Sequence, residues 1–547
     1  MADGSRSSSA ETLHPAWVRW LMPSVGDVVF IALLGLLAFT PLAVRLLGDA
    51  GIGWHIRAGQ QILATHAIPR VDSFSATMQG KQWFAWEWLY DALVGGLERV
   101  SGLNGVVFFT ALVLAGVFAW TFRLMVQRGT NVLIAVALVL LAASASMIHL
   151  LARPHVASWL FTVAWFWILD STERECSGQG VRRNRKILWL LPLLMFVWVN
   201  VHGGWLIGFV LLGIYWISAV VTRLTTKGDK LEGVLLQFRS AQRARDLAFT
   251  GMIAAVATLA NPYGWRLHSH VYHYLSNRFL MDHIDEFQSP NFHGVAQRCF
   301  AILILIAFVA LAARARRLQL SEGLVALFAV YSGLVASRNI PVSSLLLVIV
   351  AGPVLSQAFE KTGGRRLLGW ARVAELRSAG QPGAAGPTFL ARMGTVELSL
   401  RGHLWAVVTV VVSCWIVFHS GFAGPSKLMD AHFDSTRFPV QAVDFLELSG
   451  SQDPVLSPDY WGGYLIYRLY PRVLVVADDR HDLYGEEFFR QYLKMVHLEP
   501  GWESLLREQH VHRVLMPRGS AVANILAESP EWMLVYGDDV GVLFQEK

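Results

Sequence analysis

Residues 27–49 read DVVFIALLGLLAFTPLAVRLLGD, and this stretch decides the class of the protein. Between Asp27 and Leu47 the only charged side chain is that of Arg45. An apolar run of about 20 residues is long enough to cross the hydrocarbon core of a membrane as a helix. The stretch ends in Asp49, so the first predicted span delivers a carboxylate to one face of the membrane.

The composition of the whole chain agrees with a membrane location. Of its 547 residues 54% are hydrophobic and only 16% are charged, whereas soluble proteins carry about 25% charged residues. Apolar runs of similar length recur at roughly 104–124, 131–151, 205–222, 299–313 and 403–422. Shorter runs lie at 155–170, 187–201, 247–261, 320–337 and 341–358. Counted together, these runs predict a polytopic α-helical membrane protein with about 11 transmembrane helices.

The charges of the connecting loops predict the orientation of the chain. With the N-terminus placed in the cytoplasm, the cytoplasmic segments hold roughly 25 Lys and Arg residues and the short outside loops roughly 9. Contact between the basic loops and anionic lipid headgroups accounts for the formal charge of +6, so no nucleic-acid partner is expected. The basic loops lie at 182–186, 239–245, 313–317 and 359–401.

Three regions follow from this topology. Residues 1–26 form a cytoplasmic segment, residues 27–423 form the transmembrane domain with a first outside loop at 48–103, and residues 424–547 form a domain outside the membrane. The first loop predicts two helices at the membrane surface, joined by a turn. The last region has the pattern of a small α/β domain. Its β-type runs lie at 454–458, 472–478, 513–517, 532–538 and 541–545, and its helix-like stretches at 438–448, 486–497 and 501–509.

The polar motifs near the membrane gather at helix ends that this topology places outside. Ionisable groups at membrane depth are costly, so their concentration on one side indicates a functional cavity. Taken alone, each motif is explained more simply as a helix terminator that satisfies its own backbone. The five motifs are Asp49, Arg153-Pro154-His155, Asn200 with HGG at 202–204, NPYGWR at 261–266, and Arg338-Asn339.

Three arginines of these motifs, Arg153, Arg266 and Arg338, indicate what the cavity binds. Guanidinium groups donate forked hydrogen bonds that suit phosphate oxygens. No equal set of carboxylates lies at the same helix ends to neutralise them. The sequence therefore predicts binding of an anionic lipid headgroup.

The carboxylates come mainly from the first loop. Asp49 lies at the mouth of a span, where it can act as a general base on a bound headgroup. Asp72 fits a turn after the IPRV sequence, and Asp91 fits a solvated helix face. For Glu87 a solvated face and a site position both stay open. In the last region, the Asp-Asp-Arg sequence at 478–480 fits a functional loop and a local ion pair equally well.

A metal site is a further alternative. Histidines and carboxylates that could serve as ligands follow the seventh predicted span, but their spacing matches no standard zinc signature. A divalent ion held by carboxylates stays open. The sequence has no Walker motif and no Gly-x-Ser-x-Gly elbow, which argues against an ATP-driven pump and a serine hydrolase. The residues concerned are His268, His270, His273, Asp282, His283, Asp285, Glu286 and His293.

Several motifs together resemble the GT-C superfamily of integral-membrane glycosyltransferases, which use polyprenyl-phosphate-linked sugars. The more specific resemblance is to a bacterial group described as mannosyltransferase-like or RgtA/B/C/D-like. It would place the chain in a bacterial inner membrane, with the first loop and the last region in the periplasm. The motifs cover most of the chain: GWHIRAGQQIL (53–63), IPRVDSFS (68–75), WEWL (86–89), ARPH (152–155), NVHGGW (200–205), NPYGW (261–265), FQSPNFHG (287–294), SRNIP (337–341), WGGYLIYRLYP (461–471) and DDRHDLYG (478–485).

The resemblance implies roles for individual residues. In the superfamily an aspartate near the end of the first span serves as the base, and Asp49 has that place. Basic residues would hold the lipid phosphate leaving group, and Arg153, Arg266 and Arg338 are the candidates. The further substrate-binding residues expected from the same motifs are His55, Glu87, His155, His202 and Asn339.

The leading hypothesis is transfer of a sugar from a polyprenyl-phosphate-linked donor to an acceptor at the periplasmic face. The donor and the bilayer are its implied partners, and the acceptor can be a glycan, a lipid or a protein. A transporter or flippase of a lipid-linked substrate is one alternative, which would need ionisable groups along the inner half of the spans as well. A non-catalytic scaffold is the other. It is favoured by one departure from the group, which commonly carries a second acidic residue where this chain has Gly51.

Overall fold

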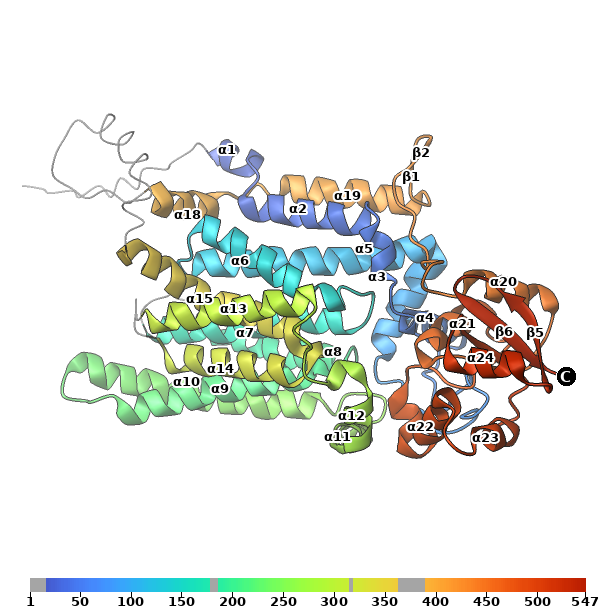
Figure 1. The fold of residues 1–547 in the computed structure, drawn as a ribbon. Helices are drawn as coiled ribbons and strands as arrows, with labels where there is room; N and C mark the ends of the chain where they lie inside the picture. Colours follow the sequence, from blue (N-terminus) through green and yellow to red (C-terminus); the bar gives the residue numbers. More distant parts are fainter. Residues whose placement is uncertain (1–15, 178–184, 314–317, 363–388) are drawn as a thin grey trace, which may run out of the picture.

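The structure is a computed structural model that describes residues 16–177, 185–313, 318–362 and 389–547. Long helices lie side by side in one bundle, and an α/β region sits at one end of it (Figure 1). The bundle helices are α2 (Val25–Ala38), α5 (Trp88–Gln127), α6 (Val132–Ala145), α7 (His155–Cys176), α8 (Leu190–Trp198), α9 (Leu206–Thr225), α10 (Leu231–Ala257), α13 (Val295–Ala312), α14 (Leu320–Val335), α15 (Ile340–Thr362), α18 (Phe389–Ser399) and α19 (Leu404–Phe418).

Several of these helices are suited to a membrane. Within the described residues, 5 helices are long and apolar enough to cross one, or up to 6 if the bent pair of α18 and α19 counts as a single span. Shorter apolar helices lie at Val132–Ala145, Lys186–Trp198 and Leu320–Val335. The chain is therefore a multi-pass helical membrane protein, as predicted, and the number of 11 spans stays a prediction.

The first predicted span, 27–47, is divided into two helices. Ser24 begins α2, because its hydroxyl accepts a hydrogen bond from the Asp27 amide at 3.1 Å while the Asp27 carboxylate accepts one from the Ser24 amide at 2.9 Å. After α2 ends, Pro41 lacks the N–H that a continuing helix would use. The short α3 (Leu42–Leu46) follows and brings the chain to Asp49.

The first loop is buried more deeply than the sequence predicts. It contains α4 (Gly51–Thr65) and the first half of α5, which is kinked at Ser101 and Gly102. One whole side of α4 is buried, and it packs against α5 and against α21 (Asp459–Leu469) of the α/β region. The two predicted helices of the loop are present, and a second structural region covers α4; their position at the membrane surface stays a prediction.

The α/β region contains a four-stranded sheet in the order β3-β4-β6-β5, in which β3 and β4 are parallel and the other neighbours are antiparallel. A small two-stranded sheet, β1 (Phe422–Ala423) and β2 (Ser426–Lys427), precedes it. The strands are β3 (Val455–Leu456), β4 (Arg513–Pro517), β5 (Trp532–Gly537) and β6 (Gly541–Glu546), and the other helices are α20 (Val440–Ser449), α22 (His481–His497), α23 (Trp502–Glu508) and α24 (Ala521–Glu528).

One predicted strand of this region, 472–478, does not form a ladder. Its Val475 makes single bridges to Val455 of β3 and to Ser75 of the first loop. The run is apolar because it lies buried between β3 and the first loop, and its backbone pairs with both of them. It leads directly into the Asp-Asp-Arg sequence at 478–480.

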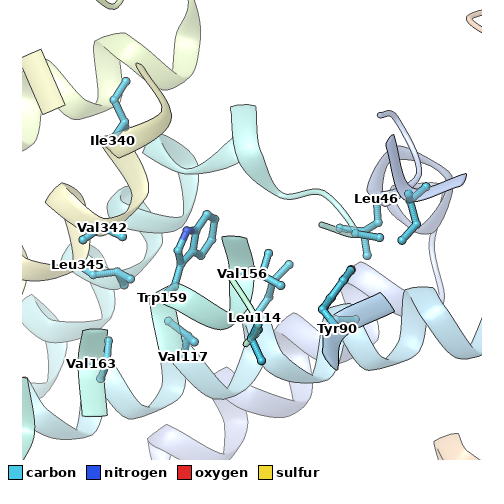
Figure 2. Packing of buried hydrophobic residues seen from close by; sticks show 14 of the residues in the cluster. Leu46, Tyr90, Leu114, Val117, Val156, Trp159, Val163, Ile340, Val342 and Leu345 are labelled. Atoms are coloured by element: carbon cyan, nitrogen blue, oxygen red, sulfur yellow. The ribbon is translucent and has the colours of Figure 1, made fainter. Parts of the chain in front are cut away.

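The core of the bundle positions the start of α7. Figure 2 shows Trp159 and Val163 of α7 near Val117 of α5 and near Leu345 of α15. All four side chains are at most 2% exposed. This packing holds the first turn of α7 beside α5, and the predicted ARPH motif ends at His155, the first residue of α7.

Candidate functional site

A cavity of about 390 Å³ lies where the helix ends meet the α/β region. Its wall is built from several separate parts of the chain, many of them turns or short helices that follow or precede a bundle helix. They include a short 3-10 helix at Gly203–Trp205 and another at Ser337–Asn339. The lining residues come from Trp54, Trp83–Glu87, Asp91, His149–Trp159, His202–Ile207, Val271–Leu275, Glu286–Phe287, Ala336–Val342 and Asp479–Asp482, although not every residue within these ranges lines the cavity.

Six of the predicted site residues line this cavity together. They lie on four different segments, so the structure brings together motifs that are up to about 250 residues apart in the sequence. The six are Glu87, Arg153, His155, His202, Arg338 and Asn339.

Arg153 is the centre of the first charged cluster. Its Nη1 donates hydrogen bonds at 2.8 Å to both carboxylate oxygens of Asp49 and to Oδ2 of Asp479. Asp49 also accepts a hydrogen bond from the Gly51 amide at 2.8 Å. Asp49 itself is not among the residues that line the cavity, although its side chain is 29% exposed.

Asp479 comes from the α/β region and lines the cavity. Its Oδ1 accepts a hydrogen bond from Nε1 of Trp54 at 2.9 Å, and its side chain is 15% exposed. Burial raises the pKa of Asp479 to about 6; Arg153 opposes the shift, while the negative charges of Asp49 and Asp478 add to it. In the sequence, a functional loop and a local ion pair fit this residue equally well, and the signal for it is the polar sequence that follows the apolar run 472–478.

A second cluster surrounds Glu87. Its two carboxylate oxygens lie 3.8 Å from Nε2 of His55 and 3.8 Å from Nε2 of His202. Burial raises the pKa of Glu87 to about 8, and the positive charge of Arg153 only partly opposes this. Glu87 therefore lines the cavity and does not lie on a solvated face, while its role in binding stays a prediction.

The Nδ1 atoms of the two histidines, on the side of each ring away from Glu87, also contact other groups. Nδ1 of His55 lies 2.6 Å from Oδ1 of Asp91, and both side chains are almost completely buried. The sequence predicted a solvated helix face for Asp91. This prediction is wrong, because α4 covers that side of α5. Nδ1 of His202 accepts a hydrogen bond from the Gly204 amide at 3.0 Å, so the Nε2 of a neutral His202 carries the proton and faces Glu87. Burial lowers the pKa of both histidines well below its usual value.

Arg338 supplies positive charge on another wall of the cavity. Its Nη1 lies 3.1 Å from Oε1 of Glu286, and its guanidinium lies 4.4 Å from the centre of the Phe287 ring. Its side chain is 28% exposed. Nearby, Nε2 of His155 donates a hydrogen bond to the His149 carbonyl at 2.9 Å, which fixes the orientation of that imidazole.

Arg266 does not belong to the cavity, in contrast to the prediction. It is exposed, and its Nη2 donates a hydrogen bond to Gln82 at 3.2 Å. It is absent from the residues that line the cavity. The reason is local: Gly264, with φ 54°, ends the turn, and α11 (Trp265–Ser276) begins with Arg266 on its outer face.

Asn200 has a structural role. Its Oδ1 accepts a hydrogen bond from Nε1 of Trp88 at 2.8 Å, and its amide donates to the carbonyls of Phe196 and Ala260. These contacts terminate α8 and join it to α5 and α10. Asn200 is therefore the helix terminator that the simpler interpretation proposed, whereas His202, Gly203 and Gly204 of the same motif line the cavity.

A buried ion network joins the first loop to the α/β region. Nη1 of Arg480 donates to Asp72 at 2.7 Å, and its Nη2 and Nε donate to Asp478 at 2.7 and 2.8 Å. All three side chains are at most 1% exposed. Asp72 also accepts hydrogen bonds from the amides of Phe74 and Ser75, so it stabilises a turn as predicted. The network holds Asp479 in place between Asp478 and Arg480.

The residues of the site do not fit a metal ion. Among the described residues, no group of three or more His, Cys, Asp or Glu side chains is arranged to hold one. The two carboxylates that converge, Asp49 and Asp479, already have the guanidinium of Arg153 between them. Their charge is compensated by an arginine rather than by a cation site.

Comparisons with known proteins give similarity of fold. No family model matches the chain, and no curated sequence matches it significantly. The apo structure of the oligosaccharyltransferase from Archaeoglobus fulgidus superposes with a TM-score of 0.53 at 11% identity, over 90% of this chain and 69% of that chain. ArnT from Cupriavidus metallidurans, bound to undecaprenyl phosphate, superposes with a TM-score of 0.47 at 16% identity, over 95% and 96% of the two chains. The assignment of the fold depends on the first of these.

Proposed function

We propose that this chain, which has the fold of the GT-C membrane glycosyltransferases, transfers a sugar from a polyprenyl-phosphate-linked donor to an acceptor hydroxyl. The observation that carries the proposal is the position of Arg153 and Arg338 on the wall of one cavity at the end of the membrane helices. Two guanidinium groups in a partly buried site suit the phosphate of a lipid that enters from the bilayer.

The chemistry follows from the charges around the cavity. As the bond between the anomeric carbon and the phosphate oxygen breaks, negative charge grows on the departing lipid phosphate, and the arginines stabilise it. A carboxylate beside Arg153 takes the proton of the acceptor hydroxyl. Asp49, the base that the sequence suggests, is one of the two carboxylates in this position. His155, His202, Glu87 and Asn339 offer hydrogen-bonding groups to the sugar.

The orientation in the membrane is part of the proposal. The α/β region lies at one end of the bundle (Figure 1), and its residues Asp479–Asp482 line the cavity together with residues of the helix ends. We place this end in the periplasm and the N-terminus in the cytoplasm of a bacterium with the chain in its inner membrane, since the basic loops of the sequence favour this direction. The three regions are then 1–26, 27–423 and 424–547, of which the last is periplasmic.

The transporter alternative is less well supported. It needs ionisable groups that face a path through the other half of the bundle. In that half, Arg128 forms ion pairs with Asp170 and Glu322, and Arg243 forms one with Glu173 at 3.2 Å. These charges are paired with one another, which favours a role in holding the helices together.

The proposal is tested with the purified chain in lipid nanodiscs and a panel of undecaprenyl-phosphate-linked hexoses and pentoses. Wild type is expected to release undecaprenyl phosphate from at least one donor. Arg153→Lys keeps the charge but loses the fork, so turnover should fall by about 100-fold.

Arg266→Ala is the matched control, because it removes an exposed arginine outside the cavity. It should leave turnover unchanged. No turnover of any donor by wild type, or equal losses in the two variants, would contradict the proposed function.

A further inference from the structure

We infer that Asp479, contributed by the α/β region, is the catalytic carboxylate that takes the acceptor proton, and that Asp49 is a positioning residue that holds Arg153. The inference rests on the proposed function and assigns one of its steps. It also makes the α/β region part of the active site, so that the cavity is chemically incomplete without it.

Of the two carboxylates beside Arg153, that of Asp479 faces the cavity. Asp479 lines it and Asp49 does not. Both oxygens of Asp49 accept hydrogen bonds from Nη1 of Arg153, and one of them also accepts from the Gly51 amide. Each oxygen of Asp479 accepts one hydrogen bond, Oδ1 from Trp54 and Oδ2 from Arg153. A carboxylate oxygen offers about two lone-pair sites, so Asp479 keeps acceptor capacity toward the cavity.

The carboxylate of Asp479 and the guanidinium of Arg153 occupy the space that a side chain at position 51 would fill. A Cβ on Gly51 would lie 2.5 Å from Oδ2 of Asp479 and 2.8 Å from Nη1 of Arg153. Any side chain there would therefore displace the carboxylate, the guanidinium or both. Because Gly51 at the start of α4 has no side chain, the carboxylate of Asp479 can lie next to Arg153. The departure at Gly51 that favoured a scaffold in the sequence is thus compensated by a residue more than 400 positions later.

The position of the Asp479 carboxylate is restrained on several sides. Asp479 lies between Asp478 and Arg480, whose buried ion pairs anchor the backbone on both sides. Trp54 fixes the orientation of the carboxylate from α4. Reacting groups must be held close to the productive geometry for catalysis, and this double anchoring supplies that restraint.

The environment also suits a base. The pKa of Asp479 lies near 6, because burial and the neighbouring carboxylates favour the neutral acid more than Arg153 opposes it. Such a group is ionised at neutral pH and more basic than an exposed aspartate. In the step, the acceptor oxygen bonds to the anomeric carbon, the bond to the phosphate oxygen breaks, the phosphate leaves with the electron pair, and the hydroxyl proton goes to Asp479.

The test compares the pH dependence of donor turnover in wild type, Asp479→Asn and Asp49→Asn, with a donor that wild type turns over. Asp479→Asn should lower turnover by at least about 100-fold over the whole pH range. Asp49→Asn should keep measurable turnover. Its acidic limb should move to lower pH than in wild type, because loss of the negative charge lowers the pKa of Asp479.

Binding of undecaprenyl phosphate, measured as a rise in Tm, separates catalysis from folding. Asp479→Asn keeps an acceptor for Trp54 and removes a negative charge near Arg153, so the lipid should stabilise it at least as much as wild type. Asp479→Glu should recover part of the turnover. Losses that are equal in the two asparagine variants, or larger in Asp49→Asn, would overturn the inference while the proposed function stands. If wild type turns over no donor, the proposed function fails and the inference falls with it.

Discussion

The carboxylates Asp49, Glu87 and Asp479 lie in one site but have different surroundings. Asp49 has an arginine and a backbone amide as donors. Asp479 shares that arginine, while Glu87 has two neutral histidines at 3.8 Å. Residue type alone would give Glu87 and Asp479 similar pKa values, and burial with these partners raises the pKa of Glu87 to about 8 and that of Asp479 to about 6. The site can therefore hold an ionised carboxylate and a neutral carboxylic acid at the same pH.

Glu87 gives a prediction on pH and stability. Its pKa is about 8 in the folded protein, against an ordinary value of 4.5. Between these values the folded state binds more protons than the unfolded state, so stability falls as pH rises through this window. Glu87→Gln removes the effect. The Tm of this variant should exceed that of wild type by several degrees at about pH 8.5 and by much less at about pH 5, as measured by thermal unfolding in detergent.

The control for this prediction is Glu531→Gln, which changes an exposed glutamate far from the cavity in the sequence. It should move the Tm little at either pH. An equal shift of the Glu87→Gln variant at both pH values would show that folding does not raise the pKa of Glu87 into this range.

At the scale of elements, the decisive contact is that between α4 and α21. A Cβ on Gly463 of α21 would lie 2.2 Å from the carbonyl oxygen of Ala50, just before α4 begins. Backbone can therefore approach backbone only because this residue lacks a side chain. The contact brings the segment that carries Asp479 to the start of α4, beside Gly51.

Gly463→Ala is therefore expected to push α21 away from α4. Overpacking of this kind costs about 1–3 kcal/mol of stability, and it should also lower donor turnover, because Asp479 moves with the region. Thermal unfolding and turnover measure the two effects.

Gly96→Ala is the matched control for this change. Gly96 lies in the first half of α5, where a Cβ would meet only Leu63 Cδ1 at 3.5 Å. It should be neutral, or stabilising by up to about 1 kcal/mol. If Gly463→Ala had an equally small effect, the close approach of α21 to α4 would not be needed for stability or for donor turnover.

At the scale of the whole molecule, Arg480 joins the first loop to the α/β region. Arg480→Ala leaves Asp72 and Asp478 buried without a cation, which should cost about 3–5 kcal/mol. A large drop in Tm and increased proteolysis of the α/β region are the expected results.

Arg468→Ala is the control for Arg480. Arg468 pairs with Asp444 and Glu447, and their side chains are 25%, 52% and 33% exposed. Loss of such exposed pairs costs at most about 1 kcal/mol. A similar small cost for Arg480→Ala would mean that the network does not hold the two regions together.

The orientation of the chain gives a second prediction at this scale. Leu448 at the end of α20 is 87% exposed, so Leu448→Cys in a chain without its native cysteines should react with a membrane-impermeant thiol reagent in intact bacteria whose outer membrane has been permeabilised. Cys176, retained alone, lies at the end of α7, which the proposed orientation puts in the cytoplasm, and it serves as the control. It should react only after the inner membrane is opened. The reverse pattern would place the α/β region in the cytoplasm.

Hydropathy and local spacing determined much of this protein from its sequence. Apolar runs predicted the membrane helices, since transfer into the bilayer depends on composition over a short window. The period of the last region predicted β4, β5 and β6, and the motifs at helix ends predicted Arg153, His202 and Arg338 as neighbours. These features are local, or follow from the side of the membrane on which a helix ends.

Only the tertiary structure decided which polar groups meet. Asp91 became buried because α4 covers it, Arg266 fell outside because α11 turns it outward, and Asp479 reached Arg153 across 326 positions of the chain. Such contacts depend on how helices rotate and dock, and docking is the sum of many weak packing terms spread over the whole molecule. No short window of sequence contains that sum, so the partners of the charged residues could not be predicted from it.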